Sequence, residues 1–305
     1  MPNKMKKLTL IIILILSGYS TWSQMDPNIT YWQDLRGVFN PASVGTNKGI
    51  DINILQREQW FGIENRPGTS ILAAGAYIGK ANSALSVTGF YDRFGFQRNA
   101  NVRVNYAYHI NLNEKTFLSA GVGIGFINTY TRISELSFAN PNEPLLDNIA
   151  ANRWQPDVSI GLEAVHPKYT IGVAVPHIIG GQGTKHPYWA RMYVAYGTYN
   201  FQIKSVKLVP AVLIRTTLFK TQVEGNVTAH FLNDRIWAGL GYRMQDAASV
   251  LFGVNVGKGV KIGYAFDYTL SRMIKYNIGT HELMLSFRWK TPRKPTPSFL
   301  NPRDF

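Results

Sequence analysis

The feature that most constrains the fold is an alternation of apolar and polar residues that begins near position 50. Ile50, Ile52 and Ile54 alternate with polar residues at positions 51 and 53. The same pattern returns at 101–110, 157–164, 222–231, 260–269 and 282–289. Successive side chains of a β-strand point to opposite faces, so a period of two predicts strands with one apolar and one polar face. The sequence therefore predicts an all-β protein.

The predicted strands are long, and their two faces differ in kind. They run about ten residues, which is the length of a strand that crosses a membrane in a barrel. The apolar face carries Tyr and Trp near strand ends, as in interfacial aromatic girdles, and the other face mixes Gly, Asn, Ser, Thr and charged residues. A soluble β-sandwich with one wet face is the alternative. Strand length and face composition favour a transmembrane antiparallel outer-membrane β-barrel.

About fourteen strands fit the pattern, an even number as in bacterial barrels. We place them at 50–60, 69–79, 84–92, 100–111, 116–129, 156–166, 168–176, 188–201, 205–216, 221–232, 235–244, 247–256, 259–269 and 280–290. One set of connections is short throughout, whereas the longest connections fall in the other set, as in barrels whose short turns face the periplasm. An even count also returns the chain to its starting side, which predicts that residues 24–49 and 291–305 are both periplasmic.

The first 23 residues have the pattern of a secretory signal peptide. Three lysines precede an apolar run at 8–16, and a site suited to cleavage lies between Ser23 and Gln24. The run is too short to cross a bilayer, which disfavours the alternative of a lone N-terminal anchor. Removal of residues 1–23 takes away three lysines and no acidic residue, so the formal charge falls from +14 to +11. Because the chain is expected to be exported, its positive charge favours anionic lipid or acidic partners over nucleic acid.

Two irregular segments flank the predicted barrel at 50–290. Residues 24–49 are expected to be either a periplasmic segment or a plug inside the lumen. Residues 291–305 contain four prolines and cannot form a barrel strand, so they predict an extended periplasmic tail. We hypothesise that the tail docks on a partner, the alternative being a disordered end without function. Its charged and apolar candidates for that contact are Arg293, Lys294, Phe299, Leu300 and Phe305.

No catalytic, cofactor or metal site is expected, and the chain is not predicted to be an enzyme. It has no cysteine, which excludes disulfides and thiolate ligands. The Gly-x-Gly-x-Gly run at 121–125 lacks the helix that a dinucleotide loop needs, and we predict strand glycines that thin the lumen wall. His109, His230 and His281 do not have metal-ligand spacing, and Gly-x-Ser-x-Gly does not occur. A catalytic triad assembled from residues of different strands is an alternative that the sequence leaves open.

One group of charged residues stands out on the predicted lumen face. If Thr269 faces Thr280, then Asp267 lies opposite Glu282, and two like charges meet. Arg243, at the end of another predicted strand, could offset them. The pair could carry proton chemistry, but an ion network that stiffens the wall is the interpretation we favour.

Several segments, taken in order, resemble the PorP/SprF membrane proteins of the type IX secretion system of Bacteroidota. The residues that carry the resemblance are Asn40, Pro41, Ala42 and Gly45, then Arg57, Gln59, Trp60 and Gly62, and finally Asp267, His281 and Glu282. The similarity is spread over nearly the whole chain after residue 23. It implies an outer-membrane component that assists export or surface attachment of cargo proteins. The partners it implies are cargo and the secretion machinery, either a periplasmic ring or a peptidoglycan-linked adaptor. A porin or small hydrophobic-solute transporter is the alternative function.

Overall fold

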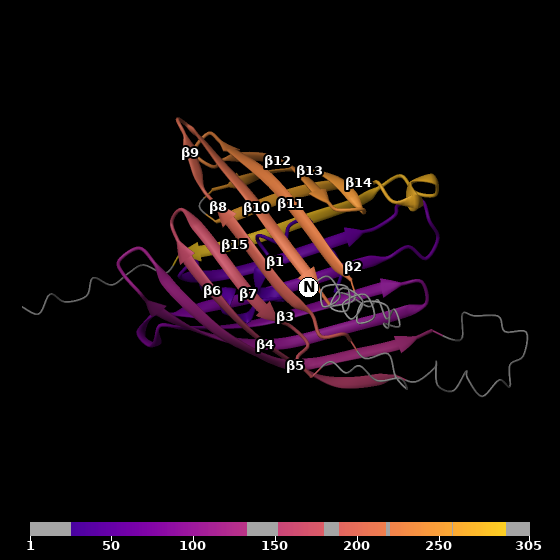
Figure 1. Ribbon diagram of the computed structural model, residues 1–305, viewed down its shortest axis with the longest axis horizontal. Coiled ribbons are helices and arrows are strands. Elements are labelled where there is room, and N and C mark those ends of the chain that lie inside the picture. Colours follow the sequence, from indigo (N-terminus) through magenta and orange to yellow (C-terminus); the bar gives the residue numbers. More distant parts are fainter. Residues whose placement is uncertain (1–25, 133–151, 180–188, 218–219, 258, 291–305) are drawn as a thin grey trace, which may run out of the picture.

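The chain forms a closed antiparallel β-barrel, seen in the computed structural model that describes residues 26–132, 152–179, 189–217, 220–257 and 259–290 (Figure 1). Its strands are β1 (Gly49–Glu58), β2 (Gly68–Ile78), β3 (Ser83–Phe94), β4 (Gln97–Asn111), β5 (Phe117–Thr131), β6 (Arg153–His166), β7 (Tyr169–Val175), β8 (Tyr193–Tyr199), β9 (Phe201–Ile203), β10 (Val206–Thr216), β11 (Thr221–Phe231), β12 (Ile236–Arg243), β13 (Ala247–Val256), β14 (Val260–Thr269) and β15 (Thr280–Lys290). Because β8 and β9 both pair with β10, they act as one interrupted strand, and the ring has fourteen members. The predicted all-β barrel of about fourteen strands is confirmed.

The ring closes where the first strand meets the last. β1 pairs with β15 from Gly49 opposite Lys290 to Glu58 opposite His281. We call the mouth at Gly49 and Lys290 the turn end and the opposite mouth the loop end. The connection between β3 and β4 at the loop end is shorter than predicted. The expected loop at 92–99 is a two-residue turn in which Gly95 takes a left-handed φ of 57°.

The barrel wall is apolar outside and polar inside. Val104 and Leu240, for example, are more than half exposed on the outer face. Most buried polar side chains of the strands face the lumen; among them are Asn53, Ser86, Thr88, Asn101, Asn105, Ser119, Ser159, Asn226 and Ser249. The lumen face also carries apolar side chains, such as Leu55, Leu213 and Met284, that belong to one buried cluster with Trp32. This is the arrangement of a barrel that meets hydrocarbon with its outer face. Within the described residues, no helix is long and apolar enough to cross a membrane.

A charge on the outer face should be far more disruptive than the same charge inside. We expect Val104→Arg, in the middle of β4, to cost about 2–4 kcal/mol in a bilayer. Thr198→Arg should cost much less, because Thr198 lines a polar lumen cavity of about 420 Å³. Heat-modifiable migration on gels measures the folded fraction. Equal losses in the two variants would contradict the assignment of faces.

The segment before β1 lies inside the barrel. It contains two short 3-10 helices, η1 (Arg36–Val38) and η2 (Pro41–Ser43). Trp32 is fully buried, and Phe39 packs edge-on against Tyr196 of β8 with ring centroids 5.7 Å apart. We call residues 26–48 the plug. The burial of apolar plug side chains against the wall explains why the segment lies within the barrel rather than outside it.

The plug also crosses the lumen from one mouth to the other. Its start, at Asp26, contacts His177 beyond the end of β7 at the loop end. Its last residues lead directly into Gly49 at the turn end. The expectation that all of residues 24–49 lies on the side of Lys290 is therefore not met by the described part of the segment. The even strand count places Gly49 beside Lys290. The plug, which precedes Gly49, starts at the opposite mouth and crosses the barrel to reach it.

Candidate functional site

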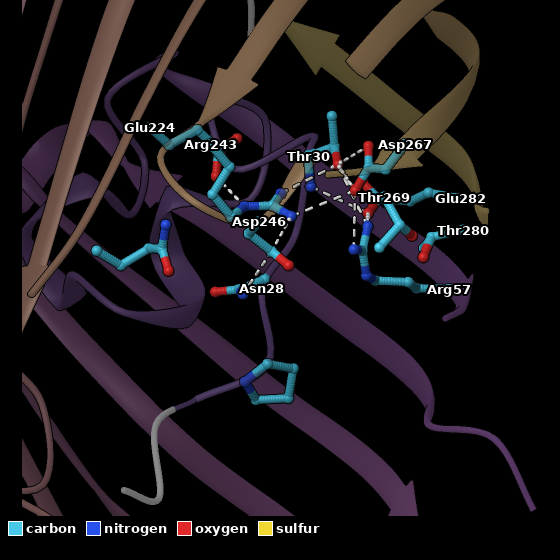
Figure 2. Close-up of polar contacts among 12 residues, drawn as sticks. Asn28, Thr30, Arg57, Glu224, Arg243, Asp246, Asp267, Thr269, Thr280 and Glu282 are labelled. Carbon is cyan, nitrogen blue, oxygen red and sulfur yellow. Dashed lines mark hydrogen bonds and ion pairs between the residues drawn. The ribbon is translucent and has the colours of Figure 1, made fainter. Parts of the chain in front are cut away.

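The strongest concentration of buried charge lies in the lumen near the loop end (Figure 2). Arg57 of β1 donates from Nη2 to Oδ2 of Asp267 and from Nη1 to Oε2 of Glu282, both at 2.8 Å. Arg243 of β12 lies 2.9 Å from Glu224 and 3.3 Å from Asp267. All five side chains are at most 3% exposed. We call these five residues the wall network.

The wall network confirms the predicted role of Arg243 but corrects the predicted register. Asp267 lies opposite Thr280, and Glu282 lies opposite Ala265 on β14 and opposite Arg57 on β1. The strands are thus shifted by two residues from the expected pairing, which leaves every side chain on its predicted face. A cause lies in the connecting loop at 270–279. There Asn277 accepts hydrogen bonds from the Thr269 hydroxyl and the Gly279 amide, so the loop closes beyond Thr269.

The register places opposite charges side by side where like charges had been expected. Arg57 is the counterion that the sequence interpretation missed, although the alternation of β1 already puts it on the lumen face. Two arginines bridging three carboxylates give a buried ion network, which supports the structural interpretation of the acid pair over proton chemistry. Removal of one member would leave an uncompensated buried charge.

The plug binds the wall network with uncharged groups. The backbone N–H groups of Thr30 and Tyr31 donate to the two carboxylate oxygens of Glu282 at 3.0 and 2.8 Å. The Thr30 hydroxyl donates to Oδ1 of Asp267 at 2.9 Å. The carboxylates also bind arginines of the wall, so the wall charges have ionic partners that do not come from the plug. The plug therefore adds hydrogen bonds to carboxylates whose charges are paired within the wall.

A second contact between plug and wall lies deeper in the lumen. Arg36 of η1 forms an ion pair with Glu163 of β6 at 3.1 Å, and Tyr196 donates a short hydrogen bond to the same carboxylate. Asn40 donates to the Tyr196 hydroxyl at 2.8 Å and to the Leu162 carbonyl at 3.2 Å. Its side-chain oxygen also accepts from the Ala42 amide. Asn40 thus caps η2 and fixes the plug to two strands, which gives this family-signature residue a structural role.

Toward the turn end, small residues allow the plug backbone to lie directly against the wall. A Cβ atom on Gly121 of β5 would come within 2.4 Å of the Ala42 nitrogen, so the close approach requires glycine. Ser119 donates to the Ala42 carbonyl at 2.5 Å. Gly45 has a φ of 69°, and a Cβ there would lie 2.3 Å from that of Ala84. The prediction that the glycine run at 121–125 belongs to a strand is confirmed, and η2 occupies the space that it provides.

The start of the plug is held by a buried histidine at the loop end. His177 lies between two carboxylates, with Nε2 2.9 Å from Asp26 and Nδ1 2.8 Å from Asp157 of β6. Arg103 also binds Asp157, at 3.3 Å. Burial lowers the pKa of His177, but the two carboxylates outweigh it and raise this pKa to about 9. We call the contact of Asp26 with His177 the latch.

The latch should weaken in alkaline solution. Because the pKa of His177 is raised from its ordinary value of 6.5 to about 9, its stabilising effect is fully present below pH 6.5 and is lost as the pH rises through about 9. A single cysteine at Asn28 should therefore react faster with a thiol reagent above this pH. Rates are normalised to an exposed loop cysteine at Glu64, which corrects for ionisation of the thiol. In a His177→Gln background the normalised rate should be flat, and a flat profile with His177 present would contradict the latch.

The remaining signature residues shape the loop between β1 and β2 or line the outer face. Gln59 donates its backbone N–H to the Pro67 carbonyl at 2.9 Å. Trp60 and Gly62 both adopt positive φ, 55° and 100°. His281 lies on the outer face, where Nδ1 is 2.6 Å from the Tyr264 hydroxyl. Tail candidates Arg293, Lys294, Phe299, Leu300 and Phe305 lie outside the described residues.

His109 and His230, two of the three histidines considered in the sequence, lie inside the barrel. His109 contacts the Val44 carbonyl through Nε2 at 3.1 Å, and His230 of β11 stacks near Trp237. Across the described ranges, no group of three His, Cys, Asp or Glu side chains could hold a metal ion.

The sequence interpretation did not single out Thr30, His177 or Glu163. The polar alternation of β6 marks Glu163 as a lumen residue, but nothing in the sequence signals its partner in the plug.

The architecture defines a class of protein. A closed antiparallel barrel with an apolar outer face and a polar lumen is an outer-membrane β-barrel. A monoaromatic hydrocarbon channel, the TodX deltaS2S3 mutant, matches with 9% identity over 83% of this chain and 93% of its own, at a TM-score of 0.50. Outer membrane protein Omp33 of Acinetobacter baumannii matches with 10% identity over 80% of this chain and 100% of its own, at 0.49. At these identities the likeness concerns the fold alone.

The sequence comparison is more specific. Residues 22–287 match the family model described as type IX secretion system membrane protein PorP/SprF. The chain belongs to this family. No curated protein matches the chain. The family context is thus a secretion system, in agreement with the resemblance drawn from the sequence.

Proposed function

We propose that this outer-membrane barrel assists the export or surface attachment of cargo proteins by contacting the type IX secretion machinery. The observation that carries the proposal is the plug, which crosses the lumen and binds buried charged residues of the wall. A barrel closed in this way presents surfaces to partners rather than an open passage. In this proposal the loop end faces the cell surface and the turn end faces the periplasm, as is usual for such barrels.

The tail is the second part of this proposal. It leaves the barrel at Lys290, on the periplasmic side in this orientation, and it combines basic with apolar residues in a proline-rich segment. Prolines reduce the entropy that an extended segment loses on docking. A periplasmic ring or peptidoglycan-linked adaptor is the partner that fits this position.

The alternative, a porin or small hydrophobic-solute transporter, requires passage through the lumen. The two functions are separated by deleting the gene and measuring secreted cargo and general permeability in the same strain. Loss of secretion with unchanged permeability supports the proposal. Loss of solute uptake with normal secretion would favour the alternative. Pull-down from membranes in mild detergent, with identification of co-purifying proteins, tests the partners directly.

A further inference from the structure

The two ends of the plug are held differently. At the turn end the plug is covalently continuous with β1, whose first residue, Gly49, pairs with Lys290. At the loop end its contacts are non-covalent. There Asp26 contacts His177, and Asn28 accepts a short hydrogen bond from Arg215 and lies 3.5 Å from Asp246. The start of the described chain is thus at the mouth opposite Lys290, where the last barrel strand ends.

We propose that the first described residue of the plug, Asp26, lies at the cell-surface mouth of the barrel and that the plug can leave the lumen only toward the periplasm. The proposal rests on the membrane orientation taken for the proposed function. The plug cannot clear the lumen by moving outward, because its last residues stay joined to Gly49 at the turn end and would still run through the barrel. Movement inward breaks non-covalent contacts alone.

The wall is suited to such a movement. Asp267 and Glu282 keep the ion pairs with Arg57 when Thr30 leaves, so withdrawal does not strip these carboxylates of their counterion. The lumen face left behind is mixed: its polar side chains would be hydrated, whereas apolar ones such as Leu55, Leu213 and Met284 lose their packing against the plug, and a partner must supply the free energy of this step. Water can replace the hydrogen bonds that the plug backbone makes to Glu282.

A partner that withdraws the plug must reach it from the turn end. The lumen cavity of about 420 Å³ is lined there by plug and wall together. In it, Asp34 of the plug lies 2.7 Å from Lys261 of β14, and Arg288 of β15 lies 2.7 Å from Asp51 of β1. These ion pairs are partly exposed, so a periplasmic polypeptide with charged side chains could compete for them.

The path of the plug is tested by labelling, since the natural chain has no cysteine. Single variants Gln24→Cys, Glu64→Cys and Glu114→Cys are treated on intact cells with a membrane-impermeant maleimide. Glu64 is exposed at the loop end and Glu114 at the turn end. Heat-modifiable migration confirms that each variant is folded. We expect Gln24→Cys to be labelled as strongly as Glu64→Cys, and Glu114→Cys to be labelled only after lysis.

Two other labelling results would each overturn one part of the proposal. Protection of Gln24→Cys with labelling of Glu64→Cys overturns the path of the plug and leaves the proposed function intact. Protection of Glu64→Cys with labelling of Glu114→Cys overturns the orientation, and the proposal falls with it.

Withdrawal is tested by a reversible lock. A Cβ atom on Gly161 would lie 2.9 Å from Cγ of Asn40, so Asn40→Cys with Gly161→Cys places two thiols within reach of a disulfide. These changes are combined with Asp26→Ala and Thr30→Ala, which remove loop-end contacts of the plug. In planar bilayers the oxidised protein should be closed, and reductant should produce a conductance. A reduced protein that is folded and still closed would overturn withdrawal.

Discussion

Replacement of Arg57 by methionine should destabilise the barrel by about 3–5 kcal/mol, because it leaves Asp267 and Glu282 buried without their shared counterion. Arg57 is 2% exposed and donates to both carboxylates at 2.8 Å. Methionine keeps most of the side-chain volume, so the loss reports charge rather than packing. The midpoint of urea unfolding in detergent or lipid, followed by heat-modifiable migration, measures the effect.

Two comparisons make the Arg57 prediction specific. Arg66→Met removes an ion pair with Glu58 that is 3.0 Å long but partly exposed, and it should change stability by no more than about 1 kcal/mol. A double variant, Arg57→Met with Glu282→Gln, should recover part of the loss because one of the unpaired charges is gone. Equal effects of Arg57→Met and Arg66→Met would show that the wall network does not stabilise the barrel.

Truncation after Lys290 should leave a folded barrel and abolish export of cargo. The barrel closes through pairs that end at Lys290, so no strand contact is lost. We expect co-purification of periplasmic partners to disappear with the tail, while heat-modifiable migration stays as in the full chain. Secreted cargo in the medium and proteins recovered by pull-down are the measurements.

A matched set of substitutions separates a docking tail from a mere spacer. Phe299→Ala, Leu300→Ala and Phe305→Ala together remove the apolar anchors and keep the length and prolines of the tail. This variant should behave as the truncation does, whereas Ser298→Ala should have no effect. Normal export by the truncated protein would show that the tail is dispensable.

The strands were predictable because each repeats a local rule, the period of two, over about ten residues. The lumen face of that pattern also contains Arg57, Glu224, Arg243, Asp267 and Glu282, so the five members of the wall network could be found without knowing their contacts. Which of these charged side chains contact one another could not be predicted from the sequence, because the register of β14 and β15 depends on how the loop at 270–279 closes. A two-residue shift preserves every face and is invisible to the alternation.

The plug shows the opposite case. Residues 26–48 have no period, and their path is set by contacts with strands far along the chain. Asn40 and Gly45 were recognised through the family resemblance, whereas Thr30, whose backbone and hydroxyl bind the wall network, carries no sequence signal. His177 fell in a predicted loop and was not singled out. Such contacts follow from the closed ring and not from local sequence.

The position of Thr30 has a consequence for how the barrel is assembled. Its amide binds Glu282 on the last strand, and its hydroxyl lies 3.3 Å from Arg57 on the first. The plug therefore spans the seam at which the ring is completed. A segment that enters a closed ring afterwards must be threaded through it, whereas one that is already in place can align the two edges. We expect the first and last strands to pair with each other while the plug already lies between them. Placement of the plug and closure of the ring would then be a single cooperative step of membrane insertion.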